Sequence, residues 1–145
     1  MNLSAETCLR GVLDTLDTRI APALAEGFSG EVMRLAGLVL AITTNSLDNA
    51  AALRVAENDA MRSLFRGTAD SVDDAVLAGQ LRAAGAEAGS GLRISELDRD
   101  NDRLRGLLVD LHVRAEDQDS PAARTTESRI WRMLNDFEIA RAPRR

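Results

Sequence analysis

The fold is decided by residues 30–67, which read GEVMRLAGLVLAITTNSLDNAAALRVAENDAMRSLFRG. Counting in steps of 3.6 from Val32 meets a small or apolar residue at almost every step, and only Thr43 and Glu57 interrupt the series. This single helical phase predicts one central helix, about 55 Å long at 1.5 Å per residue. Residues 35–42 are apolar on nearly every side, which is typical of a helix that other helices surround.

The polar run Thr43, Thr44, Asn45 and Ser46 is the weakest point of this helix. These residue types compete for backbone hydrogen bonds, so they favour caps and bends. The preserved phase favours a continuous helix, and a break here with a second helix after it is the alternative. In a functional interpretation the four side chains line a pocket between helices and hydrogen-bond a small molecule. In a structural interpretation the hydroxyls bond back onto the helix and bend it.

Serine residues mark the starts of the other helices. Ser4, Ser71, Ser95 and Ser120 each precede a helical pattern, and a serine hydroxyl can accept hydrogen bonds from the free amides of a first turn. Pro22 removes one helical hydrogen bond and predicts a kink. No alternating β-branched run or Asn-Gly turn predicts a strand. The chain is therefore predicted to be an all-α helical bundle of four to five helices around the long central helix.

The length and two local compositions predict how this bundle is organised. The 145 residues fit a single helical-bundle domain, residues 1–145. Residues 85–91 are rich in glycine and alanine, and this composition predicts a flexible loop. Residues 141–145 carry three arginines and predict a basic, solvated C-terminal tail.

A second apolar pattern suggests an interface. Leu97, Asn101, Leu104, Leu108 and Leu111 alternate spacings of four and three, as the a and d positions of a coiled coil do. We hypothesise that this face pairs with another chain, most simply a second copy. A polar residue in such a seam can set register or oligomeric state, unless that end of the helix is too exposed for Asn101 to matter.

The composition excludes several kinds of chemistry. All 18 basic residues are arginine and there is no tyrosine, which removes the lysine of a P-loop, a Schiff-base lysine and a tyrosine general acid. One cysteine, Cys8, cannot form a disulfide within the chain and suits a reducing cytoplasm. The net charge of −5 argues against nucleic-acid binding. No signal peptide precedes the first helix and no apolar run approaches the ~20 residues of a membrane span, so a cytoplasmic protein without membrane contact or cofactor is predicted.

Two small clusters of ionisable residues are candidates for catalytic or metal sites. His112 and Glu116 lie four apart and could place two metal ligands on one helix face. A di-iron bundle needs a Glu-x-x-His motif on each of two helices, which this chain lacks, so a surface pair is the better interpretation. Asp14 and Asp17 have no partner base or nucleophile at a suitable spacing, and an exposed acidic edge accounts for them better.

Part of the first half resembles a known family. Residues 20–24, IAPAL, followed by the apolar block of residues 32–42, look like a family of uncharacterised bacterial helical-bundle proteins associated with phosphotransferase-like and acyl-CoA dehydrogenase-like proteins. The resemblance covers about 45 residues and stops before Gly67. It implies an accessory role and supplies no catalytic motif.

The first functional hypothesis is a non-catalytic helical bundle that acts through protein association, as a homodimer or with an unidentified protein partner. The alternative is a bundle that binds a small molecule in a pocket near residues 43–46. A metal-dependent enzyme is a third hypothesis, and it requires carboxylates from other helices to converge on His112.

Overall fold

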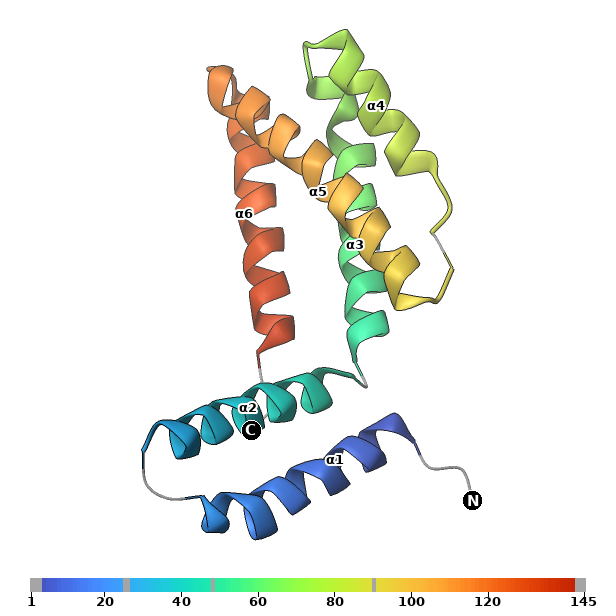
Figure 1. The fold of residues 1–145 in the computed structure, drawn as a ribbon. Helices are drawn as coiled ribbons and strands as arrows, with labels where there is room; N and C mark the ends of the chain where they lie inside the picture. Colours follow the sequence, from blue (N-terminus) through green and yellow to red (C-terminus); the bar gives the residue numbers. More distant parts are fainter. Residues whose placement is uncertain (1–3, 25–26, 48, 90, 143–145) are drawn as a thin grey trace. The chain divides into compact units, whose positions relative to one another are not determined.

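The computed structural model describes residues 4–24, 27–47, 49–89 and 91–142, and all regular structure in these ranges is helical (Figure 1). The described ranges hold six α-helices, one or two more than the sequence predicts, and no strand. They are α1 (Ala5–Thr15), α2 (Phe28–Leu47), α3 (Ala50–Thr68), α4 (Ala75–Ala86), α5 (Ile94–Asp117) and α6 (Pro121–Arg141). The predicted all-α helical bundle is therefore confirmed. None of these helices is both long enough and apolar enough to cross a membrane.

The predicted continuous central helix is wrong. Its residues form two helices, because α2 ends at Leu47 and α3 begins at Ala50. Apart from Leu47, residues 43–49 are Thr, Asn, Ser and Asp, which stabilise a helix interior poorly. Two helices that happen to be in phase give the same periodicity as one helix, so the pattern could not separate these arrangements.

The contacts within the chain gather in two compact units, unit 1 (residues 1–50) and unit 2 (residues 51–145). The single domain expected from the length stays a prediction.

Unit 1 is a helical hairpin in which α1 packs against α2 (Figure 1). The Ser4 hydroxyl caps α1 by accepting a hydrogen bond from the Thr7 amide, as predicted. The chain then passes through a π-helical segment (Leu16–Ile20) and a 3₁₀ segment (Ala21–Ala23), which together form the irregularity expected around Pro22. No residue of α1 is buried, so this hairpin has no enclosed core around its first helix.

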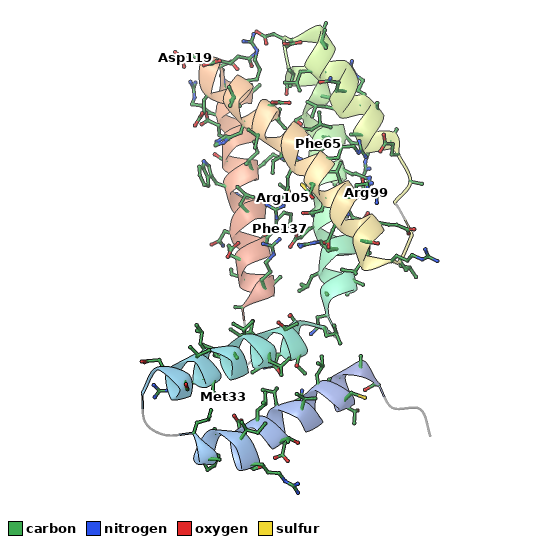
Figure 2. All side chains as sticks on the ribbon, in the orientation of Figure 1. Met33, Phe65, Arg99, Arg105, Asp119 and Phe137 are labelled. Carbon is green, nitrogen blue, oxygen red and sulfur yellow. The ribbon has the colours of Figure 1, made fainter. Side chains whose placement is uncertain are left out.

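Unit 2 holds the hydrophobic core. Phe65 of α3 and Phe137 of α6 project into it among aliphatic side chains from all four helices of the unit (Figure 2). The remaining buried members of this core are Met61, Leu64, Ala69, Leu77, Leu81, Ala84, Leu104, Leu108, Leu111, Ile130 and Met133. The scarcity of aromatic residues explains why the core is mainly aliphatic.

Two predicted boundaries in unit 2 need correction. The loop expected at residues 85–91 does not begin at Gly85, because Gly85 and Ala86 belong to α4 and Glu87 is the C-cap of that helix. Residue 90 lies outside the described ranges, and the flexibility of this segment stays a prediction. Gly85 is buried where α4 lies close to α3, so it has a packing role. The basic tail expected at residues 141–145 also starts later, since Arg141 is the last residue of α6, and residues 143–145 lie outside the described ranges.

Candidate functional site

The predicted pocket residues at the end of α2 bond to their own helix. The hydroxyls of Thr43 and Thr44 donate to the carbonyls four residues earlier, each at 2.8 Å, and the Ser46 hydroxyl donates to the Ile42 carbonyl at 3.0 Å. This is the structural interpretation that the sequence left open. Asn45 is exposed. None of the four lines the hollow between α4 and α5.

The predicted interface residues on α5 are covered by their own chain. Leu97, Leu104, Leu108, Leu111 and Asn101 are all at most 5% exposed. The heptad pattern was interpreted as a face that pairs with another chain, but α3, α4 and α6 pack around the leucines of this helix in unit 2. Any interface with another chain must therefore use a different surface.

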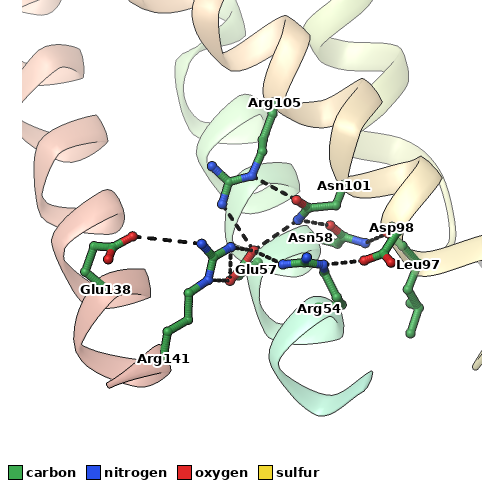
Figure 3. Close-up of polar contacts among 9 residues, drawn as sticks. All are labelled: Arg54, Glu57, Asn58, Leu97, Asp98, Asn101, Arg105, Glu138 and Arg141. Atoms are coloured by element: carbon green, nitrogen blue, oxygen red, sulfur yellow. Dashed lines mark hydrogen bonds and ion pairs between the residues drawn. The ribbon is translucent and has the colours of Figure 1, made fainter. Parts of the chain in front are cut away.

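Glu57 of α3 is the centre of a polar cluster that the sequence did not predict (Figure 3). Its side chain is 4% exposed. Both of its oxygens accept hydrogen bonds from Arg141 of α6, from Nε and Nη2 at 2.7 Å each. One oxygen also accepts bonds from Arg105 and Asn101 of α5, both at 3.2 Å, and from Arg54 at 3.3 Å. A single carboxylate thus joins α3, α5 and α6.

Asn101 links this carboxylate to a second buried amide. Its Nδ2 also donates to Asn58 Oδ1 at 2.8 Å, while its Oδ1 accepts a bond from Arg105 Nε at 2.8 Å. Asn58 in turn donates to the Leu97 carbonyl at 3.2 Å. Asn101, the polar residue among the heptad positions, is therefore hydrogen-bonded within its own chain. These bonds fix the register of α5 against α3.

The electrostatics of the cluster keep Glu57 ionised. Burial alone raises the pKa of Glu57, but the hydrogen bonds and charge of Arg141, together with Arg105 and Arg54, outweigh burial and hold this pKa below its usual value. A general base that works near neutral pH needs a raised carboxyl pKa and a free oxygen. Glu57 has neither property, so the cluster fits a structural clamp better than a catalytic site.

Further arginines attach α3 to its neighbours. The buried Arg62 forms an ion pair with Asp100 of α5, and Arg66 Nη1 donates to the Gly85 carbonyl of α4 at 2.6 Å. Burial alone raises the pKa of Asp100, but hydrogen bonds from Arg62 and Arg103 lower it overall. In these places arginine acts as a planar donor that spans two helices, a role that lysine fills less well.

The remaining candidates show no catalytic geometry in the described residues. His112 Nε2 lies 3.7 Å from Glu116 Oε1, and the imidazole meets the Trp131 ring edge to face at 5.3 Å between centroids. No group of three or more potential metal ligands forms in the part of the chain that the structure describes. Asp14 and Asp17 are exposed, which agrees with the acidic edge that the sequence favoured.

A shallow hollow of about 300 Å³ lies between α4 and α5, away from the predicted ligand residues. Its lining includes the apolar Val76, Leu77 and Val113 and the carboxylates of Asp74 and Asp110. Val76 and Val113 are more than half exposed, so the hollow is open to solvent rather than enclosed.

The apolar surface of α2 contradicts the expectation that other helices enclose it. Leu35, Leu38, Val39 and Ile42 are 62%, 56%, 56% and 60% exposed. In the sequence these residues make the helix apolar on nearly every side, and this pattern predicted that they lie in a core. We call this set of four the α2 stripe. Comparison with protein-family models, with curated proteins and with solved structures found no match to the chain.

Proposed function

We propose that this protein is a non-catalytic association module that forms a homodimer through the α2 stripe. The observation that carries the proposal is the exposure of four large aliphatic side chains on one helix, each above one half. A helix that is apolar all round is stable in water only when neighbours cover it, and within unit 1 α2 packs against α1 and the 3₁₀ segment Ala21–Ala23 while these four side chains stay exposed.

The size of unit 1 supports the need for a partner. A hairpin of about 45 residues buries too little surface to be stable without a disulfide, a metal or oligomerisation. Cys8 is the chain's one cysteine and is exposed, and the described residues form no metal cluster. Oligomerisation is the means of stabilising this unit that we propose.

A second copy is the partner that the chemistry of the stripe favours. From Leu35 to Leu47 the helix carries no charged residue, so two copies can meet here without bringing like charges together. Two helical hairpins placed face to face make a four-helix bundle, which is a common solution for burying such surfaces. The resemblance to bacterial accessory proteins is compatible with this role.

Light scattering coupled to size-exclusion chromatography tests the proposal. We expect the wild-type chain at micromolar concentration to elute with twice the mass of one chain, and Leu38→Glu to elute as a monomer. The matched control is Val76→Glu, which places the same charge at an exposed aliphatic residue of unit 2 and should leave the dimer intact. A wild-type monomer throughout the micromolar range would contradict the proposal.

A further inference from the structure

We infer that the two copies pair in antiparallel orientation, with α2 of one chain against α2 of the other and a two-fold axis between Leu38 and Val39. This inference rests on the proposed association through the α2 stripe and adds its geometry. It follows from the spacing of exposed residues along one helix face.

The α2 stripe is symmetric along its own axis. The four aliphatic residues of α2 that are more than half exposed stand at positions 35, 38, 39 and 42, and this spacing reads the same in both directions about the midpoint 38.5, whereas Val32 and Leu47 outside the stripe are 49% and 43% exposed. At 100° per residue the four positions fall within an arc of about 100°, so they form one coherent face. A surface with this internal symmetry is self-complementary under a two-fold rotation, which is what an isologous dimer requires.

Antiparallel pairing about this midpoint matches each large side chain with another. Leu38 lies opposite Val39 of the second copy, and Leu35 lies opposite Ile42. All four residues of the stripe are thereby paired with an aliphatic residue, and Val32 beside the stripe lies level with Asn45 of the second copy.

The polar ends of the stripe fit the same arrangement. Continuing the pairing outward places Glu31 opposite Ser46 of the second copy and Arg34 opposite Thr43. Glu31 already forms an ion pair with Arg34 at 3.2 Å in its own helix, so each end presents a neutralised pair to neutral hydroxyls.

A parallel dimer lacks this complementarity. It places Glu31 beside Glu31 and Arg34 beside Arg34, which brings like charges together at one end of the contact. The other end then holds only hydroxyl and amide side chains. Because Glu31 and Arg34 are paired with each other and exposed, this difference in charge favours the antiparallel arrangement only weakly, and cross-linking decides between the two.

Cross-linking between engineered cysteines tests the orientation. We would make Glu31→Cys and Ser46→Cys separately in a Cys8→Ser background and treat each variant, and their equimolar mixture, with a short bis-maleimide. Antiparallel pairing separates the two copies of residue 31 by about 22 Å along the helix axis, at 1.5 Å per residue, but places residue 31 beside residue 46. The mixture should then cross-link several times more than either variant alone.

The remaining outcomes separate this inference from the proposed function. Cross-linking of each variant with itself, and not of the mixture, would overturn the antiparallel inference in favour of a parallel dimer. A dimer by light scattering in which no combination cross-links would also overturn it, and the proposal of a homodimer would stand. A monomer by light scattering would refute both.

The control for random collision is a mixture of Ala36→Cys with Ser46→Cys. Ala36 is exposed and lies about 100° around α2 from Leu35.

Discussion

At the scale of single residues, Glu57 is a polar residue that interrupts an apolar helical pattern and yet lies at the centre of the polar cluster in unit 2. In the sequence it is one polar residue in a helical phase that is otherwise apolar. In the fold that phase points it into unit 2, where arginines from α3, α5 and α6 bond to it. Burying a carboxylate costs several kcal/mol, and this cost is recovered only when charged donors satisfy it with good geometry.

Replacing Glu57 by Gln should destabilise unit 2 by about 3 kcal/mol, because it leaves partly buried arginines without their counter-ion. Urea unfolding followed by circular dichroism measures the loss. The matched control is Glu138→Gln, since Glu138 also lies beside Arg141 but is 78% exposed. That change should cost less than about 1 kcal/mol, as exposed ion pairs contribute little. Equal losses in the two variants would contradict the central role of Glu57.

The same carboxylate predicts how stability depends on pH. Because the pKa of Glu57 is lowered in the folded state, its contribution is complete above the unfolded value of about 4.3 and is lost as pH falls through the lower folded pKa. Asp100 acts in the same direction. The free energy of unfolding of the wild type should therefore fall below about pH 4, and that of Glu57→Gln should fall less steeply. Parallel pH curves for the two proteins would show that other carboxylates dominate.

At the scale of elements, the sequence predicted helix identity better than helix limits. Ser120 and Pro121 begin α6 as expected, since the serine hydroxyl accepts a bond from the Ala123 amide and proline occupies the first turn. The start of α4 was misplaced because Asp74, rather than Ser71, accepts the amides of Val76 and Leu77. Both residues are good caps, and spacing alone could not choose between them.

Gly85 was predicted to begin a loop because residues 85–91 are rich in glycine and alanine, and its packing role is visible only in the tertiary structure. A Cβ at this position would lie 2.8 Å from Arg66 Cγ and 3.3 Å from the Arg66 amide nitrogen of α3. Arg66 cannot move aside freely, because its guanidinium donates to the Gly85 carbonyl. The absence of a side chain is what allows α4 to approach α3 this closely.

Gly85→Ala should therefore destabilise unit 2 by about 1–3 kcal/mol, as overpacking does, although alanine is the better helix former. The control is Gly79→Ala in the same helix, where nothing lies within 4 Å of the added methyl group. That change should stabilise the protein by about 0.5–1 kcal/mol through helix propensity. Thermal unfolding of the two variants beside the wild type checks the opposite signs. A stabilised Gly85→Ala would show that the two helices can separate at little cost.

At the scale of the whole chain, the two units differ in how their apolar residues are covered. Unit 2 encloses its leucines within one chain, so the heptad face of α5 proved to be a core face. The α2 stripe has an equally strong apolar pattern but is exposed. Hydrophobic periodicity predicts which residues are buried. It does not predict whether they are buried by the same chain or by another chain. For this reason the heptad pattern suggested an interface on α5, whereas its residues are buried within unit 2, and an association function stays a prediction.

This difference predicts that the two units respond differently to protein concentration in amide hydrogen exchange. If a second copy covers the α2 stripe, dilution releases it by mass action, and the amides of α1 and α2 should exchange faster at low concentration. Amides of the helices in unit 2 should keep the same protection, because their core is complete within one chain. Leu38→Glu serves as the control and should show fast exchange in α2 at every concentration. Protection of α2 that is high and independent of concentration would instead mean that the chain covers the stripe by itself, and the homodimer would have to be abandoned.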